Sequence, residues 1–276
     1  MAALDDALAL SQTWDVPHVS AVVVTADGTA AASAGDQDRV YRLASVTKLL
    51  SAYATLVAVE EGALALDQPA GPRGATVAHL LAHTAGYDFS TSTLRAEPGE
   101  RRLYSNTGFE VLADLLESET GIGFDAYAHE AVFAPLGMTS TTIGGSAAAG
   151  GASSCTDLAR FAAELQRPRL LAPATLAAAT GVAFPGLRGV LPGFGLQREN
   201  DWGLGLEIRG TKSPHWTGAH NSPETFGHFG QSGTFLWVDP RAGAALVALT
   251  DRPFGEWAAE AWPPFSDAVL GALAAR

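Results

Sequence analysis

Strand-forming segments gather at the two ends of this chain, and helix-forming segments fill the middle. A β-branched run at residues 19–25, a turn at Asp27-Gly28 and a second run at 29–34 predict a hairpin near the start. Further strands are predicted towards the other end, at residues 204–208, 234–238 and 244–249. The segment between these two groups has mainly helical periodicity. The sequence therefore predicts an α+β fold: one antiparallel sheet built from both chain ends, with flanking helices and an inserted, mainly helical domain.

The same pattern divides the chain into two parts. Residues 1–75 and 181–276 are assigned to the sheet domain and residues 76–180 to the inserted helical domain, with a site expected in the groove between them. Helices are predicted over residues 1–14, 45–62, 76–86, 107–120, 124–133, 156–166 and 263–276, and glycine-rich loops over 144–154 and 181–195.

Charge and composition exclude several classes of function. The 276-residue chain has a net charge of -12, which disfavours nucleic acid and anionic membranes as partners. Asp5 and Asp6 occupy the region where a secretory signal has basic residues, and no apolar run approaches the roughly 20 residues that span a bilayer. The single cysteine, Cys155, fits a reducing compartment. We therefore expect a cytoplasmic protein that acts on a small molecule without a metal or cofactor, and the oligomeric state stays open.

The tetrapeptide Ser45-Val46-Thr47-Lys48 carries the strongest chemical signal. Its lysine precedes an apolar run, residues 49–59, in a chain with fifteen arginines and only two lysines. On a helix, residues three apart share a face, so Ser45 and Lys48 are expected to point the same way. An ammonium in apolar surroundings is shifted towards its neutral amine, which can take the proton of a serine hydroxyl. The pair predicts a nucleophile beside a base, whereas a plain helix cap is the alternative for Ser45 alone.

Two other segments complete a recognisable set. Tyr104-Ser105-Asn106 lies just before a predicted helix, and His228-Phe229-Gly230 places a histidine between glycines at the start of a predicted strand hairpin. With Ser45-Val46-Thr47-Lys48, these segments resemble the ordered motifs S-x-x-K, Y-x-N and K/H-x-G of the serine β-lactamase and penicillin-binding protein superfamily. The resemblance is nearest to the class C β-lactamase-like branch, with its esterases and D-amino-acid peptidases. It covers roughly residues 15–275.

The resemblance implies a role for each motif residue. Tyr104 is expected to share the proton transfers, with its anionic form favoured by the charge of Lys48. Asn106 is expected to hydrogen-bond the acyl side of the substrate. The oxyanion is expected to be held by the backbone N–H groups of Ser45 and Gln231, and Gly230 is expected to let its strand approach the substrate closely.

The third motif departs from the family pattern, which usually has lysine and threonine there to bind a carboxylate. Here His228 is expected to be only partly charged at neutral pH, and Phe229 has no hydroxyl. This favours ester hydrolysis through an acyl-enzyme on Ser45. A β-lactamase, a D-amino-acid peptidase or amidase and an acyltransferase are the alternatives among enzymes, and a penicillin-sensing module without turnover is the alternative among binding proteins.

Other histidines and the tryptophans give weaker signals. His79 and His83 have the spacing of a zinc pair, but no third ligand is evident, and structural hydrogen bonding at the helix end is the preferred interpretation. His215 is expected on the surface. The tryptophans are expected to be packing residues, with Trp216 a candidate for a pocket wall because it lies in a polar loop.

Overall fold

The computed structural model describes residues 2–275, and its main feature is a six-stranded antiparallel sheet in the order β2-β1-β11-β10-β9-β8. The strands are β1 (Val19–Thr25), β2 (Ala30–Ala34), β8 (Glu207–Ile208), β9 (Phe226–Gly230), β10 (Thr234–Asp239) and β11 (Ala244–Thr250). Strand β1 pairs with β11 along its whole length, from Val19 opposite Thr250 to Thr25 opposite Ala244. The sheet is therefore built from both ends of the chain, which confirms the predicted fold class.

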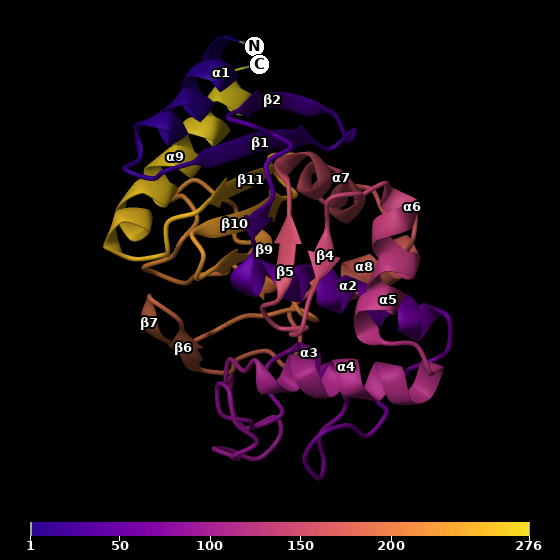
Figure 1. Cartoon of the computed structure of the whole chain (residues 1–276). Coiled ribbons are helices and arrows are strands. Elements are labelled where there is room, and N and C mark those ends of the chain that lie inside the picture. The colour runs from indigo at the N-terminus through magenta and orange to yellow at the C-terminus, as the bar shows by residue number, and fades with distance from the viewer. Residues whose placement is uncertain (1, 276) are drawn as a thin grey trace.

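Helices cover both faces of this sheet. Successive residues of β1 point to opposite sides, so Val23 joins one core and Val22 and Val24 the other. Helices α1 (Ala2–Ala9) and α9 (Glu256–Ala274) pack together on the first face, beside the two chain ends (Figure 1). Helices α2 (Thr47–Glu60) and α7 (Cys155–Gln166) cover the second face.

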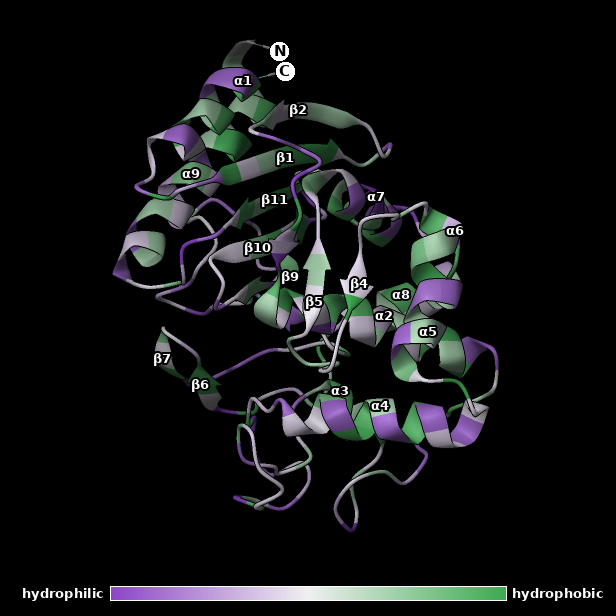
Figure 2. Cartoon of the chain, viewed as in Figure 1, coloured by the Kyte–Doolittle hydropathy of each residue, from purple (hydrophilic) through white to green (hydrophobic). Residues whose placement is uncertain are grey.

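The middle of the chain is mainly helical, as predicted. Its elements are α3 (Val77–Leu81), α4 (Thr107–Thr120), α5 (Phe124–Ala128), the π-helical turn η3 (His129–Phe133), α6 (Ala134–Leu136) and α8 (Pro173–Thr180). Helix α4 alternates between hydrophilic and hydrophobic residues along its length, as expected for a helix with one buried face (Figure 2). The precise division at residues 75/76 and 180/181 stays a prediction.

Small sheets and short turns connect these layers. Strands β3 (Tyr41–Arg42), β5 (Gly151–Ser153) and β4 (Thr142–Ile143) form a three-stranded sheet, and β6 (Gly189–Leu191) pairs with β7 (Gly195–Gln197). Two 3-10 turns, η1 (Leu10–Thr13) and η2 (Ala44–Val46), follow α1 and precede α2. The predicted loops at 144–154 and 181–195 therefore contain strand residues: β5 pairs with the distant strand β3, and β6 pairs with β7 in a local hairpin.

The boundaries of α3 and α9 differ from the prediction. Helix α3 ends at Leu81 and does not reach Gly86, because His83 adopts a left-handed conformation with φ of 56°. Helix α9 begins at Glu256 and not at Pro263, and both Pro263 and Pro264 lie inside it. The apolar residues of its first turns, such as Ala258 and Trp262, are buried against the sheet, and this packing extends the helix through the prolines.

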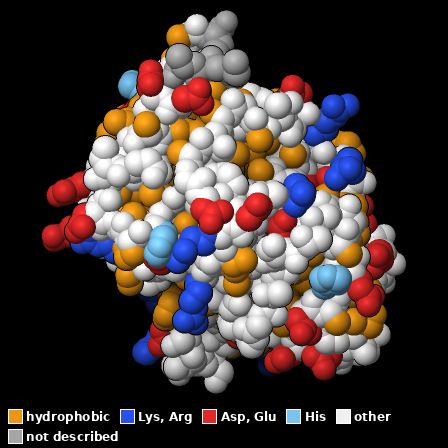
Figure 3. Space-filling view, turned by 45° about the horizontal axis from the view of Figure 1, so that its top comes forward, with side chains coloured by type: hydrophobic (Ala, Val, Ile, Leu, Met, Phe, Trp, Pro, Cys, Tyr) orange, Lys and Arg blue, Asp and Glu red, His pale blue; other side chains and the backbone are white. Residues whose placement is uncertain are grey.

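The surface is mixed in character. On the face shown in Figure 3, acidic and basic side chains are interspersed and apolar side chains reach the surface in small patches. Among the described residues, no helix is long and apolar enough to cross a bilayer. The predicted cytoplasmic location stays a prediction.

Candidate active site

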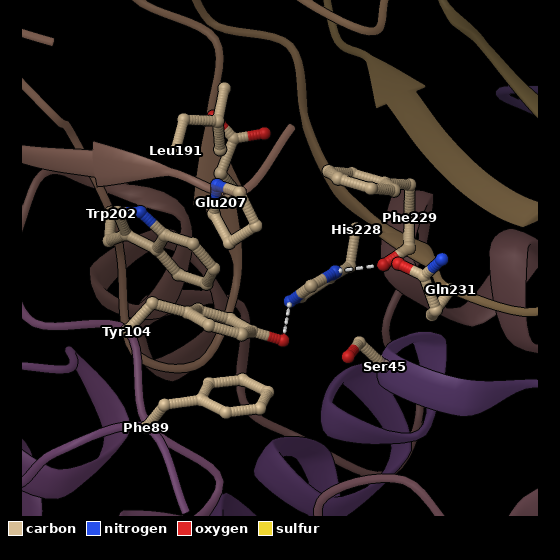
Figure 4. Close-up of a pocket in the computed structure, with 10 residues that line it drawn as sticks. Ser45, Phe89, Tyr104, Leu191, Trp202, Glu207, His228, Phe229 and Gln231 are labelled. Atoms are coloured by element: carbon tan, nitrogen blue, oxygen red, sulfur yellow. Dashed lines mark hydrogen bonds between the residues drawn. The ribbon is translucent and has the colours of Figure 1, made fainter. Parts of the chain in front are cut away.

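A cavity of about 260 Å³ brings together residues from distant segments of the chain (Figure 4). Its walls are formed by Ser45, Phe89, Tyr104, Leu191, Pro192, Trp202, Glu207, His228, Phe229 and Gln231. Four of the predicted site residues, Ser45, Tyr104, His228 and Gln231, thus share one cavity. Lys48 and Asn106 reach the same place from the protein interior.

Ser45 lies in the 3-10 turn η2, and the α-helix begins after it at Thr47. The prediction that the α-helix itself starts at Ser45 is therefore wrong by one short turn. Hydrogen bonds hold Leu43, the residue just before this turn. Its carbonyl accepts from Thr234 Oγ1 at 2.9 Å, and its N–H donates to Gly151 O at 2.8 Å. Ala44 has a positive φ of 46°, unusual for a residue with a side chain. The turn that presents Ser45 is thus held from two sides.

Lys48 points towards Ser45 from the first turn of α2. Its Nζ lies 3.4 Å from Ser45 Oγ, 2.6 Å from Asn106 Oδ1 and 2.9 Å from the carbonyl oxygen of Ala148. The lysine is fully buried, and this burial lowers its pKa to about 7, with the charge of Glu110 acting in the opposite direction. A large share of the Lys48 side chains is therefore neutral near neutral pH.

Glu110 contributes to the site although the sequence analysis did not identify it. Its carboxylate accepts hydrogen bonds from the Ser146 hydroxyl and from the backbone N–H groups of Ala147 and Ala148. These contacts fix the loop whose Ala148 carbonyl accepts from Lys48. The position of Glu110 one turn after Asn106 on α4 is the only signal that the sequence offered for it.

The Tyr104–Asn106 segment is held by His83. The backbone N–H of Ser105 donates to His83 Nδ1 at 3.2 Å, and the Ser105 hydroxyl donates to Asp88 O at 2.6 Å. His83 is buried and its ring centroid lies 4.7 Å from that of Tyr104. Structural hydrogen bonding, the preferred interpretation of this histidine, agrees with these contacts. Within residues 2–275, no group of three or more His, Cys, Asp or Glu could hold a metal ion.

Tyr104 and His228 form a neutral pair. The Nδ1 of His228 lies 2.6 Å from the Phe229 carbonyl, which can only accept, so Nδ1 carries the proton. Its Nε2 is then an acceptor for the Tyr104 hydroxyl, 3.3 Å away. Burial, reinforced by the charge of Lys48, lowers the pKa of His228 to about 3, so the predicted partial charge on this histidine is wrong.

The expectation for Tyr104 also needs correction. Burial raises the pKa of its phenol well above the usual value, and a hydrogen bond with Ser45 opposes this only in part. Lys48 Nζ lies 4.8 Å from the centre of the tyrosine ring. The charge of Lys48 does not outweigh the effect of burial on the Tyr104 pKa, so the neutral phenol, and not the anion, is the resting form.

Gly230 and Gln231 lie at the end of β9, beside the segment that carries Ser45. A Cβ at Gly230 would lie 2.1 Å from the Leu43 carbonyl oxygen, so the absence of a side chain lets β9 approach the segment before Ser45. Close packing within the protein thus gives this glycine a structural role, and its predicted role in substrate approach stays a prediction. The side chain of Gln231 donates to the Phe254 carbonyl at 3.2 Å, outside the cavity centre.

Glu207 and Trp202 line the cavity although the sequence analysis did not assign them to it. The Glu207 carboxylate accepts from Trp216 Nε1 at 2.7 Å, from His215 Nε2 at 3.0 Å and from the buried ammonium of Lys212. Burial would raise the pKa of Glu207, but His215 and Lys212 lower it well below its usual value. His215 is buried and not on the surface as predicted.

The tryptophan in the cavity wall is Trp202, and not Trp216 as expected. Trp202 stands beside Tyr104 and His228 in the cavity wall, with ring centroids 5.7 and 5.4 Å away. Trp216, the pocket candidate, is instead buried in the core on the α9 side of the sheet. The sequence offered one indication of the buried cluster around Glu207: Lys212 is one of only two lysines in the chain.

A six-stranded antiparallel sheet, a helical insertion and a serine beside a buried lysine and a tyrosine define a serine hydrolase of the β-lactamase-like superfamily. The Beta-lactamase family model matches residues 9–270, and the chain belongs to this family.

Proteins similar to this chain are described with several different activities. The crystal structure of a beta-lactamase from Mycobacterium bovis is 54% identical, with a TM-score of 0.95 over 97% of this chain and 99% of that one. The D-alanyl-D-alanine-carboxypeptidase/endopeptidase AmpH of Escherichia coli K12 is 28% identical in an alignment that covers 38% of this chain and 37% of AmpH. EstCE1, a hydrolase with promiscuous acyltransferase activity, shares the fold at 19% identity, with a TM-score of 0.82 over 98% of this chain and 99% of its own.

Proposed function

We propose that this protein hydrolyses carboxylic esters through an acyl-enzyme on Ser45. The observation that carries the proposal is the character of the catalytic cavity: among the described residues that line it there is no lysine or arginine, and its histidine, His228, has a pKa of about 3. A carboxylate next to the reacting carbonyl, as in a β-lactam or a D-alanyl peptide, would therefore meet no cation among these lining residues, and Lys48 behind them is already hydrogen-bonded to Asn106 and Ala148. A neutral ester carries no such cost.

The proposed acylation starts with the neutral amine of Lys48. Its two N–H bonds point to Asn106 Oδ1 and the Ala148 carbonyl, at 2.6 and 2.9 Å, which leaves its lone pair for the Ser45 hydroxyl at 3.4 Å. As Ser45 Oγ attacks the ester carbonyl, its proton passes to the Lys48 amine. The backbone N–H groups of Ser45 and Gln231 are the proposed donors to the oxyanion, and the Asn106 amide the proposed donor to the acyl side.

Tyr104 is the proposed proton donor to the departing alcohol. Its phenol is neutral, so it can give its proton to the leaving oxygen as the ester C–O bond breaks, and regain a proton from the Lys48 ammonium. In deacylation the same groups act in reverse on a water molecule, which releases the acid and restores Ser45. His228 accepts a hydrogen bond from the Tyr104 hydroxyl and so orients it.

One panel of substrates tests the reaction class. Purified protein is given p-nitrophenyl acetate, p-nitrophenyl butyrate, nitrocefin and a peptide ending in D-Ala-D-Ala, and acyl-enzyme is followed by intact mass. We expect saturable hydrolysis of both esters and much lower kcat/KM for nitrocefin and the peptide. An ester rate equal to that of heat-denatured protein would contradict the proposal.

A β-lactamase is the second candidate. The observation that favours it is the 54% identity to a protein described as a beta-lactamase. A kcat/KM for nitrocefin above that for p-nitrophenyl butyrate would establish this alternative and displace the esterase.

Replacing Tyr104 by phenylalanine should affect substrates according to their leaving group. For an ethyl ester, whose alkoxide must be protonated, we expect kcat to fall about a hundredfold or more, the usual scale for a positioned general acid. For a p-nitrophenyl ester, whose leaving group departs as a stable anion, the fall in the acylation rate should be much smaller. Stopped-flow and steady-state rates for both esters measure this difference, and equal losses for the two would remove the proton-donor role from Tyr104.

A further inference from the structure

A second cavity, of about 470 Å³, adjoins the catalytic cavity. The two share Phe89, Tyr104 and Pro192 in their walls. From there the second cavity extends away from Ser45, between the segment at 87–95 and the β6–β7 hairpin. We call it the arginine groove, because four arginines line it: Arg95, Arg101, Arg102 and Arg188.

One wall of the arginine groove is apolar and exposed. Val190 of β6 pairs directly with Leu196 of β7, and both face the groove, whereas the next residue, Leu191, faces the catalytic cavity. The exposed fractions are 56% for Val190, 70% for Leu196 and 51% for Phe89 at the entrance. Large apolar side chains left in solvent along one groove indicate a surface that contacts a ligand.

The rest of the groove is positively charged. Arg102 is structural, since it donates to backbone carbonyls such as Ala82 O at 2.6 Å, and Arg95 is paired with Asp88 at 2.7 Å. Within the described part of the chain, no carboxylate lies within 4.0 Å of Arg101 or Arg188, although the Arg101 guanidinium donates to the Arg95 carbonyl. In a protein of net charge -12, two unneutralised guanidinium groups beside an apolar wall select for an anion.

We infer that the arginine groove binds the leaving half of the substrate, an alcohol whose apolar stretch ends in a carboxylate or phosphate. The inference rests on the proposed ester hydrolysis, because the proposed role of Tyr104 as proton donor determines on which side of Ser45 the alcohol lies. The alcohol must lie against the Tyr104 hydroxyl that protonates it, and the groove begins at this residue. Its apolar stretch then contacts Phe89 and Val190, and its anionic end meets Arg101 and Arg188. A carboxylate adjacent to the reacting carbonyl cannot reach this far.

A matched pair of esters tests the charge preference. One is the butyrate ester of the phenol in 3-(4-hydroxyphenyl)propanoate, and the other is the same compound with its carboxylate as a methyl ester. Acyl group and phenol are identical, and the charge lies at the far end of a short chain. We expect kcat/KM to be about tenfold higher for the anionic ester, the usual scale of a charge-assisted hydrogen bond. The ratio should fall as sodium chloride is added.

Arginine variants test whether the preference for the anionic ester comes from the arginine groove. Arg188 is exposed, so Arg188→Gln can fold normally, and we expect it to bring the ratio of the two kcat/KM values close to one. Arg101→Gln should lower the ratio as well. The control is Arg167→Gln, an exposed arginine at the end of α7 and outside the groove, which should keep the wild-type ratio and rates.

Binding to the Ser45→Ala protein tests the groove without catalysis. Isothermal titration with 3-(4-hydroxyphenyl)propanoate and with its methyl ester should show about tenfold tighter binding of the anion, lost in the Ser45→Ala, Arg188→Gln double variant. Charge-selective binding without any turnover would support the groove and contradict ester hydrolysis. Turnover of both esters with no charge preference in rate or binding, or a preference that survives in Arg188→Gln and Arg101→Gln, would overturn the inference and leave ester hydrolysis standing.

Discussion

The Ser45→Ala protein should lose turnover of every ester and all covalent labelling by a fluorophosphonate probe. Ser45 Oγ is the atom that the buried Lys48 amine approaches, at 3.4 Å, and alanine removes it without disturbing the turn that presents it. We expect kcat to fall by about a thousandfold or more, because the remaining groups have no nucleophile to activate. Steady-state rates with p-nitrophenyl butyrate and intact mass after probe treatment give both readouts.

Ser232→Ala is the matched control for this experiment. Ser232 lies next to Gln231, and its hydroxyl is 3.2 Å from Thr234 Oγ1, so it offers a second hydroxyl close to the site. We expect this variant to be labelled and to turn over substrate like the wild type. Stoichiometric labelling of Ser45→Ala would place the nucleophile elsewhere and remove the proposed mechanism.

Lys48→Met should lower kcat by about a hundredfold or more, the scale of a lost general base. In the wild type the active form is the neutral amine, and burial lowers the Lys48 pKa to about 7. Below this pH the ammonium has no lone pair to accept the Ser45 proton. We therefore expect kcat/KM to rise with pH through about 7 and to level off above it, and this rise to be absent from the residual rate of Lys48→Met.

The other titratable groups of the cavity make this profile easy to interpret. His228 has a pKa of about 3, and burial keeps the phenol of Tyr104 neutral well above neutral pH. Neither titrates near pH 7, so one transition is expected there. His228→Gln should keep the transition while lowering the rate. A flat profile around pH 7, or a transition that disappears in His228→Gln, would assign the base to a group other than Lys48.

Much of the fold and the grouping of the site residues could be predicted because they depend on local patterns. The strand runs near both ends predicted the sheet, and the spacing of Ser45 and Lys48 follows from the geometry of one helical turn. The three motifs come from separate segments, and it was their resemblance to the ordered family motifs that grouped Tyr104 and His228 with Ser45. The structure brings all of them to one cavity.

Other features depend on contacts between segments far apart, which a single sequence does not display. Glu207 keeps its charge inside the protein because Lys212 and His215 meet it there, so the burial of that histidine could not be predicted from its polar loop. The neutral state of Tyr104 likewise depends on Trp202 and His83 covering its ring. Burial sets the direction of the pKa shift for Tyr104, whereas the neighbouring His215 and Lys212 set it for Glu207, and both depend on tertiary packing.

The burial of both lysines also affects which groups on this protein an activated ester can acylate. Lys48 and Lys212 are 0% and 3% exposed, so apart from the amino terminus the surface presents guanidinium groups in place of primary amines. Activated esters acylate free amines, whereas a guanidinium stays protonated and unreactive at neutral pH. The two buried lysines are therefore poor targets for an activated ester at the surface of this protein. One added acyl group in its intact mass consequently marks the active-site ester with little background from surface modification.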